Sequence, residues 1–399
     1  MTATTARESN ESIFTTTQAY TFDDVVIVPA FSSTLPDAVD VSAVFSRDIR
    51  LASPLISAAM DRVTESKMAI AMARSGGLGV IHRNMSIAEQ SQQVVRVKRS
   101  QSGWITDPVT LSISATLQDA EDIMSQFHIS GVPIVNAERK LVGILTNRDT
   151  RFCEAQDFAR SVADFMTAAP LITAPMGTTL AQARTILGKH RLEKLPLVDS
   201  DGTLMGLITV KDILKATEHP NATQDERGRL RCGAAVGVGA DLEERVNALE
   251  KAGVDAVCID TAHGHSLGVL NAIRRIRSDW PDLAIVAGNV VTAEGVDALV
   301  EAGADTVKVG VGAGSICTTR VVSGAGLPQL SAIWEAARAA DRLHIPIIGD
   351  GGVAYSGDIV KAIAAGASTV MIGSMLAGAD ESPGEVELFE GRRYKSYRG

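Results

Sequence analysis

The segment PLISAAMDRV, Pro54 to Val63, decides between two fold classes for this 399-residue chain. It combines an apolar strand pattern with a polar turn, and that turn contains no glycine. A doubly wound nucleotide-binding sheet expects a glycine-rich turn after its first strand, where the next helix opens. The segment therefore favours a closed (β/α)8 barrel, the other common fold built from alternating parallel strands and helices.

Further short apolar segments along the chain repeat this pattern, and each ends near Gly, Asp, Asn or His. The stretches between them, such as EERVNALEKAG from Glu243, carry apolar residues at helical spacing and end at glycine. Eight strands with intervening helices predict an α/β protein with the (β/α)8 TIM barrel fold. The predicted strands are Pro54–Met60, Gly77–His82, Gly233–Val238, Ala256–Asp260, Ala284–Asn289, Thr306–Gly310, Pro346–Gly352 and Thr369–Gly373.

A repeat interrupts the barrel pattern after its second strand. ISGVPIVNAERKLVGILTNRD, from Ile129, matches RLEKLPLVDSDGTLMGLITVKD, from Arg191, and Pro133 and Pro196 are 63 residues apart. Each copy predicts a helix, a strand after proline, a polar turn, a second strand, and a helix beginning at Arg-Asp or Lys-Asp. The pattern resembles a pair of CBS motifs, which together form a Bateman domain.

Four polar residues recur at matching positions of the two copies. A threonine and an aspartate three residues later can cap a helix. They also suit the ribose of a regulatory nucleotide, and CBS pairs commonly bind adenine or guanine nucleotides. Both interpretations apply to Thr146, Asp149, Thr209 and Asp212.

These patterns divide the chain into four parts. Residues 1–18 are polar and are predicted to be disordered. Residues 19–103 form the first part of the barrel and residues 219–399 the second. The CBS pair occupies residues 104–218, with its two motifs at 104–160 and 161–218.

Composition limits the classes of partner. Hydrophobic residues make up 45% and charged residues 21%, which is typical of a soluble globular protein. A net charge of -9 disfavours nucleic acid as a partner, and no run of 18 apolar residues predicts a membrane span. The four cysteines lack the spacing of a disulfide framework or a zinc site, so we expect a cytoplasmic protein that binds small molecules.

One cysteine lies in an unusually glycine-rich segment, GVGAGSICTTR, Gly310 to Arg320. Cys317 has polar neighbours and follows the sixth predicted strand, where barrel enzymes place reacting groups. Its thiol could therefore be a nucleophile or simply an exposed group. Cys232 and Cys258 lie in or beside apolar strands and are expected to be inert core residues.

Two glycine-rich loops follow the seventh and eighth predicted strands. They are GDGGVAYSGD, from Gly349, and GSMLAG, from Gly373. Barrel enzymes often hold a phosphate at these two loops, because backbone N–H groups can approach it there. The alternative is a pair of tight turns without a ligand.

The whole chain resembles one enzyme family. The run GVGAGSICTTRVVSGAGLPQ is similar to the active-site loop of bacterial IMP dehydrogenases, and TFDDVVIVPA, SAAMDRVTES, IDTAHGHS and KSYRG extend the resemblance. GMP reductase shares the barrel and the Cys-Thr-Thr-Arg tetrapeptide, while the CBS pair and the KSYRG ending favour the dehydrogenase. A nucleotide-sensing homologue without catalysis is a third alternative.

The resemblance implies NAD-dependent oxidation of IMP to XMP in guanine nucleotide synthesis. Cys317 would attack carbon 2 of the purine, and Thr319 would help position the hydrolytic water. A potassium ion would be held by the carbonyls of Gly312, Gly314 and Cys317. The residues implied for the substrate are Ser315, Asp350, Gly351, Gly352, Gly373, Ser374 and Tyr397, and those for the cofactor are Asp260, Asn289, Gly310 and Gly312.

The family pattern continues beyond the KSYRG segment with a Met-Gly-Ser segment, a mobile flap whose Arg-Tyr pair activates water, and a last barrel helix. We therefore expect a truncated or flap-deleted form whose hydrolysis step is impaired. The family also implies a homotetramer, which CBS pairs can join into an octamer.

Overall fold

The computed structural model describes residues 18–100, 108–127 and 129–398. The chain divides into two compact units. The first contains the residues up to Ser100, Asn221–Asp225, and everything from Leu230 onward. The second contains residues 101–220 and 226–229. The segment predicted to be disordered, residues 1–18, lies outside the described residues except for Gln18.

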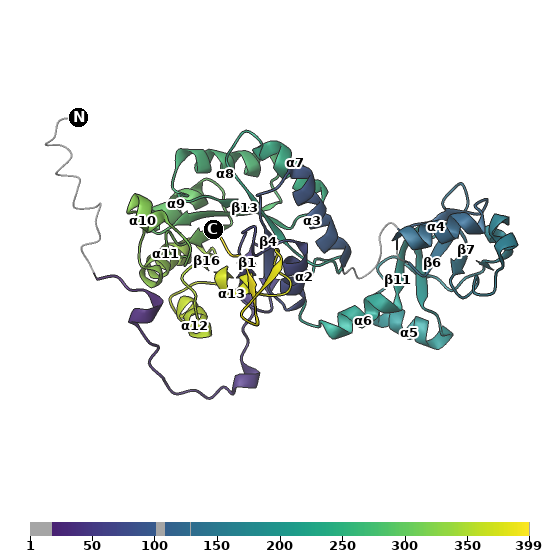
Figure 1. Ribbon diagram of the computed structural model, residues 1–399, viewed down its shortest axis with the longest axis horizontal. Coiled ribbons are helices and arrows are strands. Elements are labelled where there is room, and N and C mark those ends of the chain that lie inside the picture. Colours follow the sequence, from purple (N-terminus) through teal and green to yellow (C-terminus); the bar gives the residue numbers. More distant parts are fainter. Residues whose placement is uncertain (1–17, 101–107, 128, 399) are drawn as a thin grey trace. The chain divides into compact units, whose positions relative to one another are not determined.

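Eight parallel strands of the first unit close into a barrel, as predicted (Figure 1). Every neighbouring pair is parallel, and β17 returns to β3 to close the ring. Each predicted strand is present, usually shorter by one to three residues at an end, where the chain turns toward a helix. The strands are β3 (Leu55–Ser57), β4 (Leu78–Ile81), β12 (Gly233–Val236), β13 (Ala256–Asp260), β14 (Ala284–Val290), β15 (Thr306–Val309), β16 (Ile347–Asp350) and β17 (Thr369–Ile372).

Helices follow the strands and cover the outside of the barrel (Figure 1). The outer core lies between these two layers, and Val307 and Val309 of β15 are fully buried in it with Val296 and Ile333 of the facing helices. Burial of such aliphatic groups is the main stabilising contribution. The helices are α2 (Ser66–Arg74), α3 (Ile87–Ser100), α7 (Leu242–Lys251), α8 (Leu267–Asp279), α9 (Ala293–Glu301), α10 (Thr319–Ser323), α11 (Gln329–Leu343), α12 (Ser356–Ala364) and α13 (Ser374–Ala377).

A hairpin closes the end of the barrel at which the strands begin. It consists of β1 (Ala43–Ser46) and β2 (Ile49–Leu51). Phe45 and Leu51 belong to the same buried cluster as Ile348 and Val286 of the barrel interior. The hydroxyl of Thr306, the first residue of β15, donates to the Phe45 carbonyl at 2.9 Å. The hairpin therefore fills the barrel interior at the end where the strands begin, and the end where the strands finish remains open for a site.

A buried ion-pair cluster lies where the chain leaves the first unit and returns to it. Lys98, in the last turn of α3, places its Nζ atom 2.6 Å from Oδ2 of Asp255 and 3.4 Å from Oδ2 of Asp225. Burial raises the pKa of Asp255, and the charge and hydrogen bond of Lys98 oppose that rise. The N–H of Thr223 also donates to Ala73 of α2 at 2.8 Å. The two ends of the interruption are thus fixed to the same part of the barrel.

The second unit contains the two sequence repeats. The sheet of the first copy has the order β5-β6-β7-β8 and that of the second β11-β10-β9. The elements are β5 (Leu111–Ser112), α4 (Leu117–Phe127), β6 (Gly131–Val135), β7 (Leu141–Thr146), β8 (Thr167–Ala168), β9 (Ala174–Pro175), α5 (Leu180–His190), β10 (Lys194–Val198), β11 (Leu204–Thr209) and α6 (Val210–Glu218).

One prediction for this unit was wrong. The helix expected to begin at Arg-Asp forms only in the second copy, as α6, while residues 147–152 of the first copy form turns. Ile213 of α6 packs into the hydrophobic core of its copy. The matching position of the first copy is Thr150, which offers no apolar side chain to such a core. A helix of that length is stable mainly through packing of its apolar face, so the first copy lacks the necessary contacts.

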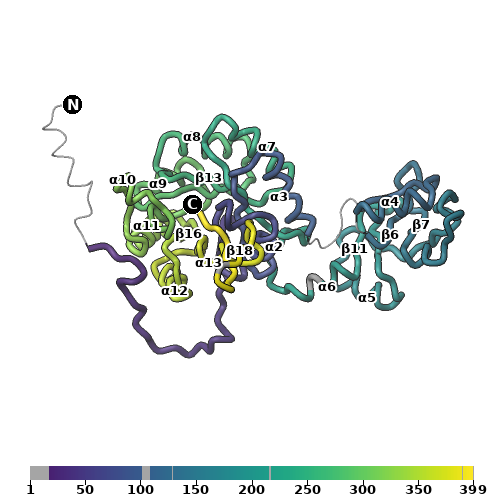
Figure 2. Tube along the Cα trace, in the orientation of Figure 1, coloured from purple at the N-terminus to yellow at the C-terminus, as the bar shows by residue number. Residues whose placement is uncertain are grey.

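An exposed segment precedes the hairpin. Residues 25–42 run outside the barrel with little regular structure (Figure 2). Val26, Val28 and Phe31 are 82%, 82% and 95% exposed.

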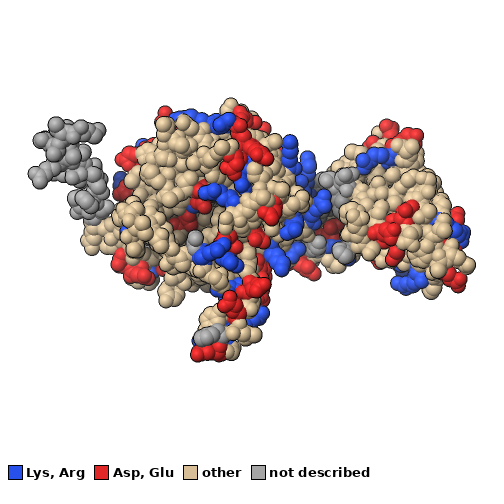
Figure 3. All heavy atoms as spheres, turned by 45° about the horizontal axis from the view of Figure 1, so that its top comes forward, with Lys and Arg blue, Asp and Glu red and all other residues tan. Residues whose placement is uncertain are grey.

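Figure 3 shows acidic and basic side chains interspersed over the visible face of the barrel. Across the described ranges, no helix is both long and apolar enough to cross a bilayer.

Candidate active site

The predicted site residues of the barrel lie at the ends of its strands or in the loops that follow them. Asp260 ends β13, Asn289 lies near the end of β14, and Asp350 ends β16. Cys317 lies in the loop after β15, and Gly373 directly follows β17. In a closed parallel barrel these positions share one rim, which is where barrel enzymes carry their reacting groups.

Cys317 is exposed and its environment favours the thiolate. Its Sγ atom lies 3.2 Å from Oγ1 of Thr319. The pKa of the Cys317 thiol is lowered first by that hydroxyl and next by the backbone N–H of Thr319, and burial opposes these two effects. The N–H of Gly312 and the charge of Arg320 add smaller contributions in the same direction. A lowered pKa in an accessible loop is the usual setting of a nucleophilic cysteine.

The other cysteines differ from Cys317. Burial raises the pKa of Cys258 to about 12, and its side chain is packed in the barrel interior. Cys232 is also buried, and burial raises the pKa of the partly exposed Cys153. Among the four free cysteines, only Cys317 is exposed. This separates the candidate nucleophile from the core thiols, as the sequence predicted.

The glycines around Cys317 allow close approaches between loops. Gly310 has φ 143°, and a Cβ atom there would lie 2.1 Å from the backbone oxygen of Asp350. Gly312 has φ 71°, and a Cβ atom there would lie 2.4 Å from Cγ of Arg320. Only glycine adopts such angles without strain and leaves this space. The backbones of the loops after β15 and β16 therefore contact each other directly at Gly310. The side chain of Arg320 packs against the cysteine loop at Gly312.

Two buried side chains that were not predicted from the sequence, Gln329 and Lys308, hold this rim together. The Gln329 amide, at the start of α11, donates to the carbonyls of Val309 and Asp350 at 3.0 Å each. Lys308 of β15 is 3% exposed in its side chain, and its Nζ donates to Oδ1 of Asp260 at 2.8 Å and to Oδ2 of Asp350 at 2.6 Å. A charged residue in the middle of TVKVG was the available signal, because a core strand seldom carries an unpaired charge.

Asn289 joins the same group. Its Oδ1 accepts from Lys308, and its Nδ2 donates to the carbonyl of Gly310 at 2.6 Å and to Oδ2 of Asp350 at 2.9 Å. Asp260, Asn289 and Asp350, predicted separately from the resemblance, are thus brought together around Lys308. Both N–H groups of the Asn289 amide donate within the protein, whereas the side chains of Asp260 and Asp350 are 34% and 20% exposed.

A second group contains part of the predicted substrate set. Tyr397 lies beside Ser315, whose hydrogen bond partly offsets the rise in the Tyr397 pKa that burial causes. The Tyr397 hydroxyl is also 3.8 Å from Sδ of Met60, and a Cβ atom on Gly373 would lie 3.1 Å from it. The negative charge of Asp350 acts on Tyr397 as well, which connects the two groups. Gly351 approaches the backbone of Gly314, while Gly352 and Ser374 lie at the exposed edge.

An ion pair fastens the segment that carries Tyr397. Arg398 donates from both Nε, at 3.0 Å, and Nη2 to Oδ2 of Asp61, which follows β3. Asn84, after β4, donates to the same oxygen at 3.0 Å. Just before this segment, β18 (Val386–Phe389) and β19 (Arg392–Lys395) form a hairpin with Glu390 and Gly391 at its turn.

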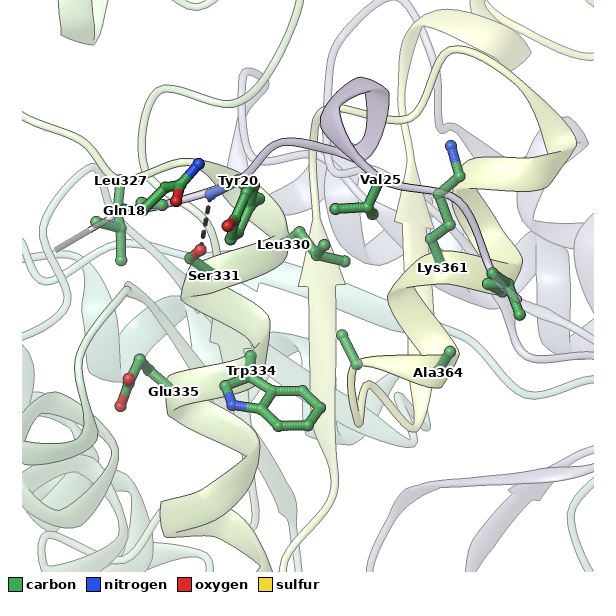
Figure 4. A pocket seen from close by; sticks show the side chains of 13 residues that line it. Gln18, Tyr20, Val25, Leu327, Leu330, Ser331, Trp334, Glu335, Lys361 and Ala364 are labelled. Atoms are coloured by element: carbon green, nitrogen blue, oxygen red, sulfur yellow. Dashed lines mark hydrogen bonds between the residues drawn. The ribbon is translucent and has the colours of Figure 1, made fainter.

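A separate cavity of about 540 Å³ lies between α11, α12 and the segment that begins at Gln18 (Figure 4). Trp334, Leu330, Tyr20 and Lys361 contribute to its lining. None of its lining residues is a predicted site residue. The chemistry of Cys317 therefore belongs to the rim of the barrel and not to this cavity.

The four predicted regulatory residues lie in the second unit, apart from the barrel residues. In each copy the threonine donates from its N–H and its hydroxyl to the aspartate, at 2.7 and 2.7 Å for Thr146 and Asp149 and at 2.9 and 2.6 Å for Thr209 and Asp212. In the second copy these bonds cap α6, which is one of the two interpretations that the sequence left open; in the first copy the same bonds form although no helix follows.

A cationic group lies between the two copies. Lys194 of β10 donates to the hydroxyl of Ser130 at 2.9 Å. Burial lowers the pKa of Lys194, and the nearby charges of Arg148 and Lys211 lower it further against the opposing effect of Glu193. Arg148 and Lys211 each lie directly beside one of the capping aspartates in sequence.

A comparison with protein families places the chain. Residues 19–399 match the family described as "IMP dehydrogenase / GMP reductase domain". The chain belongs to the IMP dehydrogenase / GMP reductase family. The resemblance that the sequence indicated is thereby confirmed.

Relatives within the family include bacterial IMP dehydrogenases. The chain is 56% identical over 382 residues to inosine-5′-monophosphate dehydrogenase of Aquifex aeolicus and 58% identical over 382 residues to that of Halalkalibacterium halodurans. Each alignment covers 96% of this chain and 78% of the relative. The enzyme named inosine-5′-monophosphate dehydrogenase in Bacillus subtilis is 56% identical over 384 residues.

Solved structures of the family share the fold. A cysteine-to-alanine variant of GMP reductase from Trypanosoma brucei, in complex with guanosine 5′-monophosphate, has a TM-score of 0.87 and 40% identity, covering 97% of this chain and 82% of that one. GMP reductase from the same organism with guanosine 5′-triphosphate has a TM-score of 0.84 at 40% identity, covering 94% and 90%.

Proposed function

We propose that this chain oxidises IMP to XMP with NAD through a covalent adduct on Cys317. The observation that carries the proposal is the exposed Cys317 thiol with a lowered pKa, on the rim that also presents Asp350, Ser315 and Tyr397. The identity to dehydrogenases of several bacteria supports the choice of substrate.

The thiolate of Cys317 attacks carbon 2 of the purine, and the Sγ–C2 bond forms. The hydrogen on that carbon leaves as a hydride. Water then attacks the same carbon, the Sγ–C2 bond breaks, and XMP and a proton are released, which regenerates the thiolate. A cysteine suits this sequence because it is both a good nucleophile and a good leaving group. Thr319, beside the sulfur, is suitably placed to help orient the water.

Substrate recognition uses the remaining groups of the rim. The partly exposed carboxylate of Asp350 accepts hydrogen bonds from the ribose hydroxyls. The phosphate lies toward Ser315, Gly351, Gly352, Gly373, Ser374 and Tyr397, where backbone N–H groups and hydroxyls supply donors.

The cofactor fits on the side of Asp260. That carboxylate is partly exposed and can accept from hydroxyls, and the backbone of Gly310 and Gly312 leaves space beside it. When bound, NAD supplies the hydride acceptor. The carbonyls of Gly312, Gly314 and Cys317 are neutral oxygen ligands of the kind that potassium binds. Activity in potassium and its loss in lithium would test that part.

A single-turnover mixture of protein, IMP and NAD tests the function. NADH absorbance should rise, and mass spectrometry should find a nucleotide adduct on the Cys317 peptide.

GMP reductase activity is a second candidate, because the similar solved structures are GMP reductases with guanine nucleotides. Oxidation of NADPH in the presence of GMP, without NADH formation from IMP, would establish the reductase instead. Nucleotide binding without either absorbance change would indicate a nucleotide sensor.

The second unit is proposed to be a CBS pair that binds a regulatory adenine or guanine nucleotide. Its cations, Lys194, Arg148 and Lys211, suit phosphate, and Asp149 and Asp212 beside them suit ribose hydroxyls. A phosphate would relieve the mutual repulsion of the three cations, which is the physical reason for a site there.

We also propose a homotetramer, with octamers joined through CBS pairs. The exposed apolar side chains of residues 25–42 support an interface, because patches of this kind mark association surfaces. The four free cysteines agree with a reducing compartment such as the cytoplasm. Light scattering of the purified protein would measure the assembly directly.

A further inference from the structure

Lys308 is a buried cation at the centre of the rim. Its neighbours Val307 and Val309 face the outer core, so its own side chain enters the barrel. An ammonium group has three N–H donors. They are directed at Asp260 on β13, Asn289 beside the end of β14, and Asp350 on β16. One side chain therefore connects the carboxyl-terminal ends of four consecutive strands.

The charge of Lys308 is balanced within this group. Burial alone lowers the pKa of Lys308, but the carboxylates of Asp260 and Asp350 outweigh that effect and raise it. Two carboxylates that share a site repel each other. Lys308 donates to both and so offsets that repulsion.

The orientation of the two carboxylates follows from the same contacts. Lys308 bonds one oxygen of each, Oδ1 of Asp260 and Oδ2 of Asp350, while Asn289 also donates to Asp350. The other oxygen of each carboxylate is not used by the ammonium. Both side chains remain partly exposed, whereas Lys308 is enclosed. The exposed oxygens of an anionic carboxylate can only accept hydrogen bonds, which selects ligands that present hydroxyl donors.

We propose that Lys308 is the positioning residue that couples the substrate and cofactor sites, by holding Asp350 and Asp260 as paired, anionic acceptors for ribose hydroxyls. This inference rests on the proposed function. Lys308 itself does not take part in bond making, because its three donors are occupied and it remains protonated at neutral pH.

The matched control is Lys98. It too is a buried lysine between two carboxylates, with 5% of its side chain exposed, but its partners Asp225 and Asp255 lie at the opposite end of the barrel strands. Replacement of Lys98 changes the same type of contact without touching the rim. A change in KM that occurs in the Lys308 variant but not in the Lys98 variant is therefore an effect on ligand binding at the rim.

The experiment compares Lys308→Met, Lys308→Arg and Lys98→Met with the wild-type chain. We expect Lys308→Met to raise the KM for IMP and for NAD together and to lower kcat/KM by about 100-fold, because small misplacements of binding groups have effects of that size. Discrimination between IMP and 2′-deoxy-IMP should shrink. Lys308→Arg, which keeps the charge, should recover part of the loss, and Lys98→Met should leave both KM values near wild type.

The pH dependence separates positioning from a merely structural role. Without the ammonium, one carboxylate retains its proton to a higher pH, so the acidic limb of kcat/KM for IMP should move upward in Lys308→Met. Equal KM values in Lys308→Met and wild type, or an unmoved acidic limb, would overturn the inference. If Lys308→Met does not fold, Lys308→Met with Asp260→Asn removes the repulsion and should still weaken discrimination at Asp350.

Failure of the proposed function gives a different pattern. If wild type forms no NADH but binds IMP, equilibrium binding of IMP and 2′-deoxy-IMP to wild type and Lys308→Met tests the inference alone. Absence of IMP binding by the wild-type chain would overturn both.

Discussion

The Sγ atom of Cys317 lies 3.2 Å from the Oγ1 atom of Thr319 at the start of α10. The same residue contributes its backbone N–H, so Thr319 accounts for the two largest effects that lower the pKa of the thiol. A helix of five residues fixes both groups toward the sulfur. The reactivity of the loop is therefore set two residues beyond the nucleophile.

Replacement of Thr319 by valine should raise the pKa of Cys317, because the hydroxyl that stabilises the thiolate is lost. Iodoacetamide should then react more slowly at neutral pH, and the midpoint of its rate against pH should move to higher pH. Thr319→Ser keeps the hydroxyl and should retain the wild-type midpoint. Equal midpoints in wild type and Thr319→Val would contradict this explanation.

Cys317→Ser should abolish the NADH burst and the nucleotide adduct while IMP binding stays within a few-fold of wild type. In the wild-type chain, limited alkylation should modify Cys317 first, because the pKa of Cys258 is about 12 and its thiol is buried. Cys153→Ser, in the second unit, is the control and should keep the burst. Adduct formation on another cysteine would refute the assignment.

Gly310→Ala should lower activity by about 100-fold, because its Cβ would collide with the Asp350 backbone and its φ is strained for alanine. Gly268→Ala, in α8, is the control. A Cβ atom there would meet no atom within 4 Å. Comparable losses in the two variants would show that the close approach at Gly310 is unimportant.

Arg398→Gln should raise the KM for IMP a few-fold, since the ion pair with Asp61 holds the segment that carries Tyr397. The hydrogen bond from Arg398 is the main cause that lowers the pKa of Asp61. An acid whose pKa is lowered in the folded state stabilises that state at pH values above its ordinary pKa, which is near 4. This stabilisation is lost as the pH falls through the pKa of the folded state. Asp61→Asn carries no charge at any pH, so it should lose the ion pair with Arg398 just as wild type does in strong acid.

The exposed Arg393 of β19 provides the control, and Arg393→Gln should leave the KM for IMP unchanged. Hydrogen exchange of the segment that carries Tyr397 should be faster in Arg398→Gln than in wild type. No change in either measurement would mean that the pair is only a surface contact, which often contributes little.

Lys194→Met should weaken binding of adenine or guanine nucleotides to the second unit by about ten-fold, as expected for loss of one charge-assisted contact. Lys189→Met, on the exposed face of α5, should bind them as wild type does. Calorimetry with the chain that contains both units measures both. Undiminished binding by Lys194→Met would place the nucleotide elsewhere.

The barrel was accessible to prediction because each strand is a local pattern of apolar residues that ends at a polar or glycine residue. The neighbours of Cys317 were also local, and its distinction from Cys258 followed from them. The absence of a helix after Thr146 was not predicted, because the repeat preserves the capping residues Thr146 and Asp149 but not the apolar residue that matches Ile213. A cap starts a helix only when later residues can pack.

The group around Lys308 could not be predicted from local patterns. Its partners Asp260, Asn289 and Asp350 lie 48, 19 and 42 residues away in the chain and meet only when the barrel closes. The pair between Asp61 and Arg398 spans 337 residues, nearly the whole chain. Such contacts depend on strand order, which periodicity does not encode.

The cluster of Lys98, Asp225 and Asp255 has a consequence for how the chain tolerates its interruption. Lys98 precedes the interruption and its partner Asp225 lies where the chain returns, so one ion pair holds the two ends of this long loop within a side chain's length. The entropy of closing a loop grows only with the logarithm of its length, so an interruption of more than a hundred residues differs little in cost from a short one. This position is therefore suited to exchange: another domain, or a brief linker, could replace the second unit while the barrel keeps its register.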